Sequence, residues 1–338
     1  MGRQIAFVFD LNKCMGCQTC SVACKVLWLG DEPGTQGQWW CSVNTLPGRG
    51  VPRDWETMGG GYDAKGQLVF GELPSPEEFG ARSDYNWAEV HAAPAGSVPL
   101  QPRDGKPAWA MNWDEDEGSG EYPNAYFYYL PRICNHCSKP ACVDACPNGA
   151  LAKTEAFGVV VRDEGRCRGV QQCAQACPYK KVYFNQVLKI SEHCMGCLPR
   201  LEQGVAPACV RQCPGRAVFV GWRDDPDSAV HKLVDTYGVA LPHHPEFNVE
   251  PNVFYVPPLS PFRVRPDGTI EEGQRRIPLA HLEAQFGPRV GDALATLETE
   301  MARRQRGERS EVMDLLIAHR WHELLGPFTR DPAEISWR

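Results

Sequence analysis

Short apolar runs along the chain predict strands that are separated by irregular segments. Residues 4–10 are rich in β-branched and aromatic side chains, which favours an extended segment near the N-terminus. Residues 151–162 have the pattern of a hairpin that turns near Phe157 and Gly158. Further apolar runs that predict strands lie at residues 182–185, 187–190 and 217–222.

The apolar pattern becomes helical in the last third of the chain. A helix is predicted at residues 227–237, because Pro226 precedes it and Gly238 follows it as a stop. Residues 241–262 are rich in proline and are expected to be extended. From residue 278 to residue 325, leucine and methionine recur at spacings of three and four, which predicts helices. This tail is long enough to wrap around the domain or a partner.

Cysteines fill the segments between the predicted strands. Fifteen of the 16 cysteines fall into four groups, and in three groups a proline follows the last cysteine. Lys25 stands in place of that proline in the first group. The groups are Cys14, Cys17, Cys20 and Cys24; Cys134, Cys137, Cys142 and Cys146; Cys167, Cys173 and Cys177; and Cys194, Cys197, Cys209 and Cys213.

This spacing is typical of iron–sulfur cluster binding. Closely spaced thiolates on a tight loop wrap three corners of a cubane, and the fourth cysteine of the run ligates the other cluster in two-cluster ferredoxins. Structural zinc also takes four thiolates, and the last group alone has the spacing of a zinc ribbon. The first two groups suit a cubane better, and the C-x2-C spacing favours metal over disulfide bonds. We therefore predict iron–sulfur clusters.

The third group has only three cysteines. Val170 lies three residues after Cys167 and three before Cys173, where an evenly spaced group would place a fourth thiolate. A three-cysteine site holds a [3Fe–4S] cluster, because the missing corner has no thiolate to retain a fourth iron. The cysteine count therefore predicts three [4Fe–4S] clusters and one [3Fe–4S] cluster.

Charge and composition narrow the class of protein. The net charge of −7 argues against a general nucleic-acid surface, and no run approaches the length of a transmembrane helix. The segment before Cys14 lacks the charged and apolar regions of a signal peptide. Residues 26–125 are dense in Trp, Gly, Pro and acidic residues and are expected to be irregular. Their acidic run at residues 114–117 is interpreted as a solvated loop.

Side chains beside the cysteine groups have more ordinary interpretations. Cys41 lies outside every group, beside Trp39 and Trp40, and is interpreted as a buried inert thiol. His136 and His193 each precede a grouped cysteine. Since the thiolates suffice without them, these imidazoles are expected to hydrogen-bond or pack rather than ligate. Cations expected beside the three-cysteine group, which tune or balance its charge, are Arg166, Arg168, Lys180 and Lys181.

The chain resembles the iron–sulfur β subunits of the type II dimethyl-sulfoxide-reductase-like molybdoenzymes. That family includes ethylbenzene and dimethylsulfide dehydrogenases and the chlorate, selenate and respiratory nitrate reductases. Respiratory nitrate reductase has a tryptophan where Val170 stands and a longer β subunit, which favours the soluble periplasmic members. The resembling stretches span most of residues 4–262 and lie at residues 10–20, 52–55, 129–137, 167–169, 177–181 and 255–261.

The resemblance implies an α+β fold of two interleaved bacterial-ferredoxin-like modules, each with two clusters. Residues 1–25 and 187–225 would form the first module, and residues 126–186 the second. A long irregular insertion at 26–125 would contact other subunits. Residues 226–338 would form a partly helical C-terminal extension.

The resemblance also implies which cysteines share a cluster, although spacing alone equally allows the third group to pair with the fourth. One [4Fe–4S] cluster would take Cys14, Cys17, Cys20 and Cys213; a second Cys24, Cys194, Cys197 and Cys209; and a third Cys134, Cys137, Cys142 and Cys177. The [3Fe–4S] cluster would take Cys146, Cys167 and Cys173.

The implied function is electron transfer rather than catalysis. The clusters would relay electrons between a catalytic α subunit, which carries a molybdenum bis-guanine-dinucleotide cofactor, and a haem b γ subunit of a periplasmic oxidoreductase. The chain would be loaded in the cytoplasm and exported with a twin-arginine-bearing α subunit. The alternatives are the β subunit of a membrane-bound, cytoplasmic-facing complex of the nitrate-reductase type, and a zinc-stabilised interaction scaffold. The substrate is set on the α subunit and is invisible here.

Overall fold

The computed structural model describes most of the chain outside residues 76–117. The described residues are 3–75 apart from 31 and 36, then 118–317 and 320–335, with a few positions between 78 and 101. The acidic run at residues 114–117 lies outside them. No helix among the described residues is long and apolar enough to cross a membrane.

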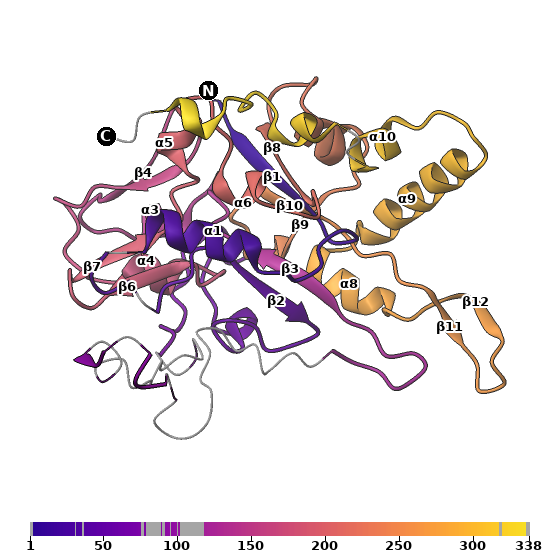
Figure 1. The fold of residues 1–338 in the computed structure, drawn as a ribbon, viewed down its shortest axis with the longest axis horizontal. Coiled ribbons are helices and arrows are strands. Elements are labelled where there is room, and N and C mark those ends of the chain that lie inside the picture. The colour runs from indigo at the N-terminus through magenta and orange to yellow at the C-terminus, as the bar shows by residue number, and fades with distance from the viewer. Residues whose placement is uncertain are drawn as a thin grey trace.

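A four-stranded mixed sheet forms the centre of the fold (Figure 1). Strand β1 (Ile5–Asp10) lies between β8 (Val218–Trp222), which is antiparallel to it, and β10 (Val253–Val256), which is parallel. The short strand β9 (Leu241–Pro242) pairs with the other edge of β10. The sheet therefore joins the start of the chain to a segment more than two hundred residues later.

Alternate residues of β1 enter two different cores, because successive side chains of a strand point to opposite faces. Ile5, Phe7 and Phe9 pack into the core that contains many of the cysteines. Ala6 and Val8 pack into a second core formed with the C-terminal helices. Every residue of β1 is buried as a result, which explains its nearly continuous apolar sequence.

Four short helices carry the later cysteines of the groups and pack in two pairs. Helix α1 (Thr19–Trp28) contacts α6 (Ala208–Arg211), and α3 (Ala141–Asp144) contacts α4 (Gln172–Ala176). Helix α1 contains the last two cysteines of its group, whereas α3, α4 and α6 each contain one cysteine and end just before the next. A cysteine loop followed by a short helix is thus a repeated unit.

Two-stranded antiparallel pairs accompany the central sheet, and three of them contact these helices. The pair β2–β3 joins the early insertion to the strand that precedes the second cysteine group. The pairs are β2 (Ser42–Leu46) with β3 (Tyr128–Arg132), β4 (Leu151–Lys153) with β5 (Val160–Arg162), β6 (Val182–Asn185) with β7 (Ile190–His193), and β11 (Phe262–Val264) with β12 (Ile270–Arg275).

The C-terminal helices lie along one side of the molecule in Figure 1, with β11–β12 projecting beyond them. The last two of them help to cover the second face of the central sheet, whereas the first packs into the core that contains many of the cysteines. These helices are α8 (Leu279–Phe286), α9 (Val290–Gln305) and α10 (Glu311–Ile317). The remaining helical segments are α5 (Leu198–Leu201), α7 (Ala229–His231) with a π-helical continuation at Lys232–Thr236, and single turns at Trp55–Thr57, Pro245–Phe247, Trp321–Leu325 and Pro332–Glu334.

The predicted elements are confirmed with two exceptions. The segment 187–190 was expected to be a strand, but it forms the turn of the hairpin, and β7 begins only at Ile190. Residues 241–262 were expected to be merely extended, but they contain β10, an inner strand of the central sheet. Its apolar run is only four residues long and lies among prolines, which hid the strand signal.

Replacement of Phe7 by alanine tests the role of β1. Phe7 is 1% exposed, so Phe7→Ala leaves a cavity and should cost about 3–5 kcal/mol of stability. The urea midpoint of unfolding, followed by circular dichroism, should fall clearly. The matched control is Phe70→Ala, because Phe70 is 49% exposed and its loss should move the midpoint little. Equal shifts in the two variants would contradict this account of the core.

Candidate iron–sulfur centres

The first cysteine loop and the end of α6 form one thiol set. Cys14, Cys17, Cys20 and Cys213 lie close enough for their charges to interact. Gly16 has φ +67°, and a Cβ at that position would come within 2.5 Å of the Tyr129 ring, so the loop requires glycine there. A small pocket is lined by three of these cysteines on the loop and helix and by Cys213.

The start of the fourth cysteine group and the end of α1 form a second set. Cys24, Cys194, Cys197 and Cys209 interact electrostatically and line a small void together with apolar side chains. The Trp28 indole Nε1 donates a hydrogen bond to Cys197 Sγ over 3.2 Å. An N–H aimed at a ligand sulfur stabilises negative charge there. Sequence reasoning missed this contact.

The middle groups form the two remaining sets around α3 and α4. Val170, in the loop between two of these cysteines, is 50% exposed and offers no ligand atom. The thiols that interact in one set are those of Cys134, Cys137, Cys142 and Cys177. The thiols that interact in the other set are those of Cys146, Cys167 and Cys173.

The distances between these thiols suit clusters better than single metal ions. A zinc ion binds four sulfurs at about 2.3 Å, which puts them about 3.8 Å from one another. Among the described residues, ligand atoms from three or more residues lie within 4.8 Å of one another only at Glu56, His243 and His244. None of the cysteine sets is that compact. A cubane accepts wider spacing, because each thiolate binds a different iron.

Burial makes the free thiolates unfavourable. It raises the pKa of Cys14 and of Cys194 to about 12, and it raises the pKa of Cys24 and of Cys209 well above its usual value. Iron binds the thiolate, so insertion of a metal group releases protons and stabilises the fold at the same time. The donor set is therefore suited to a buried metal group rather than to free, reactive cysteines.

The basic side chains are not arranged as expected from the sequence. Lys181 lies beside Cys24 and Cys194, not beside the three-cysteine set. Its ammonium donates to the Trp39 carbonyl and to the Ser42 and Tyr183 hydroxyls, and burial lowers its pKa to about 7. The reason is local: Lys181 immediately precedes β6, which directs its side chain towards the start of the insertion. Of the four cations, only Arg166 and Arg168 belong to the exposed loop that contains Cys167.

The two histidines are buried beside cysteine loops. Val160 N–H donates to His136 Nδ1, and His193 Nδ1 donates to the Cys194 carbonyl. The Nε2 atoms of both rings have no hydrogen-bond partner. Burial lowers the pKa of both imidazoles, so each ring is neutral. The interpretation as hydrogen-bonding or packing residues stays a prediction for both.

Cys41 is buried, in agreement with its interpretation as an interior thiol. The sequence did not predict its neighbours. The Cys41 thiol hydrogen-bonds Cys20 and lowers the pKa of that residue. Its charge also interacts with those of Cys24 and Cys209. Cys41 thus lies between the first two thiol sets.

Sequence reasoning also missed an ion-pair cluster around the buried His244, which joins the insertion to the C-terminal half. The His244 imidazole lies between the carboxylates of Glu56 and Glu246, at 3.4 Å and 2.6 Å. Burial disfavours the imidazolium, but the carboxylates outweigh burial and raise the His244 pKa. No local sequence pattern predicts this contact, because Glu56 and His244 are far apart in the sequence.

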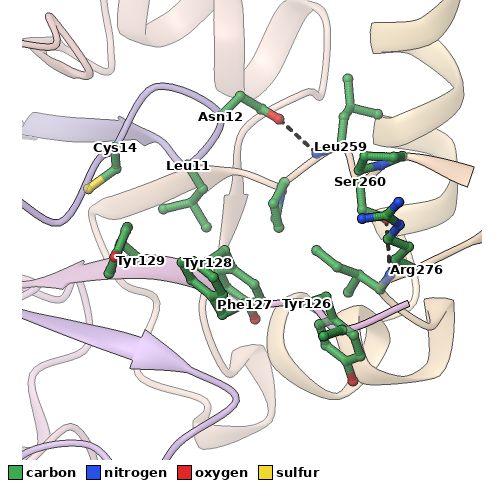
Figure 2. A pocket seen from close by; sticks show the side chains of 14 residues that line it. Leu11, Asn12, Cys14, Tyr126, Phe127, Tyr128, Tyr129, Leu259, Ser260 and Arg276 are labelled. Atoms are coloured by element: carbon green, nitrogen blue, oxygen red, sulfur yellow. Dashed lines mark hydrogen bonds between the residues drawn. The ribbon is translucent and has the colours of Figure 1, made fainter. Parts of the chain in front are cut away.

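A hollow lies beside the first thiol set (Figure 2). The aromatic residues 126–129 line one side of it, and the segment 258–261 lines another. Asn12 Oδ1 accepts a hydrogen bond from Leu259 N over 2.7 Å, which ties the first cysteine loop to that segment. Cys14 reaches the wall of the hollow, so this thiol set is close to the surface.

Comparison with known proteins identifies the family. Residues 125–223 match a family model described as a 4Fe–4S dicluster domain. The chain is 49% identical to the dimethylsulfide dehydrogenase subunit beta of Rhodovulum sulfidophilum, over 95% of this chain and 98% of the relative. It is 51% identical to the selenate reductase subunit beta of Thauera selenatis, over 94% and 97%. It is 31% identical to the respiratory nitrate reductase 2 beta chain of Escherichia coli, over 89% and 79%.

The chain belongs to this family of oxidoreductase β subunits. The resemblance predicted from the cysteine groups is therefore confirmed. The β subunit contains a ferredoxin-like iron–sulfur domain within a mixed α and β fold, and its function is electron transfer in an oxidoreductase complex.

Removal of the Trp28 hydrogen bond should affect one cluster only. Trp28→Phe keeps the ring but removes the donor to Cys197, so the midpoint potential of that cluster should fall, because its reduced form is more negative. The measurement is a redox titration followed by electron paramagnetic resonance. Trp40→Phe is the control, since Trp40 lines the same void but donates to Gln38. An unchanged potential in Trp28→Phe would refute the proposed effect of this hydrogen bond.

Proposed function

We propose that this β subunit is a non-catalytic electron-transfer subunit that binds a chain of four clusters. It carries electrons between a catalytic α subunit, which holds a molybdenum bis-guanine-dinucleotide cofactor, and a haem b γ subunit. The observation that carries this proposal is that 15 cysteines from four sequence groups come close enough for their charges to interact, both within the proposed sets and between neighbouring sets. Each cluster supplies a one-electron carrier, and the protein holds it in place and excludes water.

The ligand assignment follows the thiol sets. Three [4Fe–4S] clusters bind to the four-cysteine sets, and a [3Fe–4S] cluster binds to the three-cysteine set. Cluster 1 takes Cys14, Cys17, Cys20 and Cys213; cluster 2 takes Cys24, Cys194, Cys197 and Cys209; cluster 3 takes Cys134, Cys137, Cys142 and Cys177; and cluster 4 takes Cys146, Cys167 and Cys173.

Two helix pairs support an arrangement of two interleaved ferredoxin-like modules. Helices α1 and α6 provide ligands for clusters 1 and 2, and α3 and α4 provide ligands for clusters 3 and 4. The first module thus takes its loops from both ends of the cysteine-bearing region, and the second lies between them in the sequence. The insertion at 26–125 and the extension at 226–338 are proposed to lie outside the two modules.

Shared elements support an arrangement of the four proposed clusters in a row. Cys20 and Cys24 on α1 connect clusters 1 and 2. The Cys134 and Cys194 thiols interact electrostatically, which brings clusters 2 and 3 together. The helix α4 and its end connect clusters 3 and 4. We propose that electrons move between neighbouring clusters along this row, in the direction that the reaction of the α subunit sets.

Exposed apolar side chains near each end of this row suit contacts with other subunits. Cys17 is exposed beside Met15, which is 57% exposed, and α1 presents Val22 and Val26 to solvent. At the other end Val170 is exposed in the cluster 4 loop. Gly169 lies against the turn that holds the exposed Val187 and Leu188. We assign the cluster 1 end to the α subunit and the cluster 4 end to the γ subunit.

We further propose that the complex works in the periplasm and crosses the membrane in the folded state with its α subunit. The cysteines of cluster 2 are buried, so this cluster must be inserted before the fold closes. Transport of a folded chain satisfies that order. Cell fractionation that finds the complex only on the cytoplasmic side would favour the alternative, a nitrate-reductase-type complex.

Metal content tests the number of clusters. Protein purified anaerobically with its native partners should contain, from this chain, about fifteen irons, four for each closed site and three for the open one. Acid-labile sulfide should be present, and zinc should not be stoichiometric with the chain. Irons on other subunits are subtracted by analysis of the separated β subunit. One or more zinc ions per chain with little iron would support the scaffold alternative instead.

The substitution Val170→Cys tests the open-cornered cluster. The added thiolate should convert [3Fe–4S] to [4Fe–4S], whose oxidised form gives no paramagnetic signal, and should lower its potential. Val170→Ala is the control and should retain the three-iron signal of the oxidised wild type. The measurement is electron paramagnetic resonance of the oxidised proteins, which detects the three-iron signal. A wild type without the three-iron signal, or a cysteine variant that retains it, would refute the assignment of cluster 4.

A further inference from the structure

His136 has a backbone conformation that favours glycine. It occupies the third position of the loop between Cys134 and Cys137, with φ +43°. The same position is glycine in the loops at residues 14–17 and 194–197, where Gly16 and Gly196 have φ +67° and +63°. A side chain in this conformation is strained, and such strain often accompanies a function. The strained backbone at His136 therefore suggests that its imidazole has a function.

The hydrogen bonds of the ring determine where its proton lies. Val160 N–H donates to His136 Nδ1 over 3.2 Å, so Nδ1 is an acceptor and the proton of the neutral ring is on Nε2. The side chain is 1% exposed, and Nε2 has no hydrogen-bond partner. A buried N–H donor without an acceptor is costly. An acceptor that a bound cluster supplies would remove this cost.

The Nε2 end of the ring lies against the other module. A Cβ built on Gly196 would stand 3.1 Å from His136 Nε2, so the Cys194–Cys197 loop closes directly on the imidazole. At the same junction, the backbone N–H of Cys134 donates to the Cys194 sulfur. Donors from the second module thus face the loop that provides two of the four ligands of cluster 2.

We propose that His136 Nε2–H donates a hydrogen bond to a sulfur of the cluster bound by Cys24, Cys194, Cys197 and Cys209. His136 is then a positioning residue that belongs to one module and raises the potential of the adjacent module's cluster. The inference rests on the proposed ligand assignment. The hydrogen bond would couple the two modules where electrons pass between clusters 2 and 3.

His193 cannot take this role. Its Nδ1 donates to the Cys194 carbonyl, so the Nε2 of the neutral ring has no proton to donate. It is instead the competing acceptor, since the two rings lie near each other and both Nε2 atoms are unpartnered. If His136 donated its hydrogen bond to His193 instead of to the cluster, a substitution that removes the His136 donor would leave the cluster potentials unchanged.

Two substitutions of similar size separate hydrogen bonding from packing. His136→Leu removes the donor, and its cluster 2 potential should fall while the other three potentials stay in place. His136→Gln keeps an N–H donor and should restore much of the wild-type potential. The cluster that shifts must be the one that shifts in Trp28→Phe, because Trp28 donates to Cys197 of the same set. The measurement is a redox titration of the purified complex, followed by electron paramagnetic resonance.

His136→Gly guards against a failure to fold, since glycine occupies this position in two other loops. It should load all clusters and show the same lowered potential as His136→Leu. Wild-type protein with ¹⁵N-labelled histidine provides a test without any variant, because a histidine nitrogen bonded to a reduced cluster gives a hyperfine coupling to it.

Unchanged potentials in His136→Leu and His136→Gly, a shift at another cluster, or no histidine coupling in the wild type would overturn the inference. Failure of the proposed function is a separate result, since it would appear in the wild type as a wrong iron count.

Discussion

The interior of this β subunit depends on thiols that are unfavourable as free anions. Burial raises the pKa of most cysteines of the first, second and third sets. The apolar core around β1 therefore contains thiols whose anionic form becomes favourable only when a metal binds it. A chain of this size has few other means of filling those cavities. Folding and cluster insertion are therefore one coupled process. The short helices and hairpins, which have little stability of their own, are held together through these centres.

The cysteine groups could be predicted from sequence because ligand spacing is local. A loop that wraps a cubane must place its thiolates within a few residues, and the helix that follows carries the next one. The same locality explains why β1 and the hairpin of β4 and β5 were predicted. Strand β10 was not, because its four apolar residues lie among prolines, although it pairs with β1 at the centre of the sheet.

Contacts between distant segments could not be read from the sequence. Trp28 donates to Cys197 across 169 residues, and Glu56 reaches His244 past three of the four cysteine groups. Lys181 was expected beside the three-cysteine set from its position in the chain, but its side chain turns towards Cys24 and Cys194. Charge and hydrogen bonds around a cluster are properties of the folded chain, and these properties tune potentials.

The central claim is that Cys213 shares a cluster with the first cysteine group and Cys177 with the second, which makes a row of four. An iron-edge anomalous difference map from crystals of the complex tests this most directly. Four iron centres in a row should appear in this chain, with Cys213 bound to the same centre as Cys14 and with three protein ligands at the last. Density that joins the third cysteine group to the fourth, or single-ion peaks at the cysteine sets, would contradict the account.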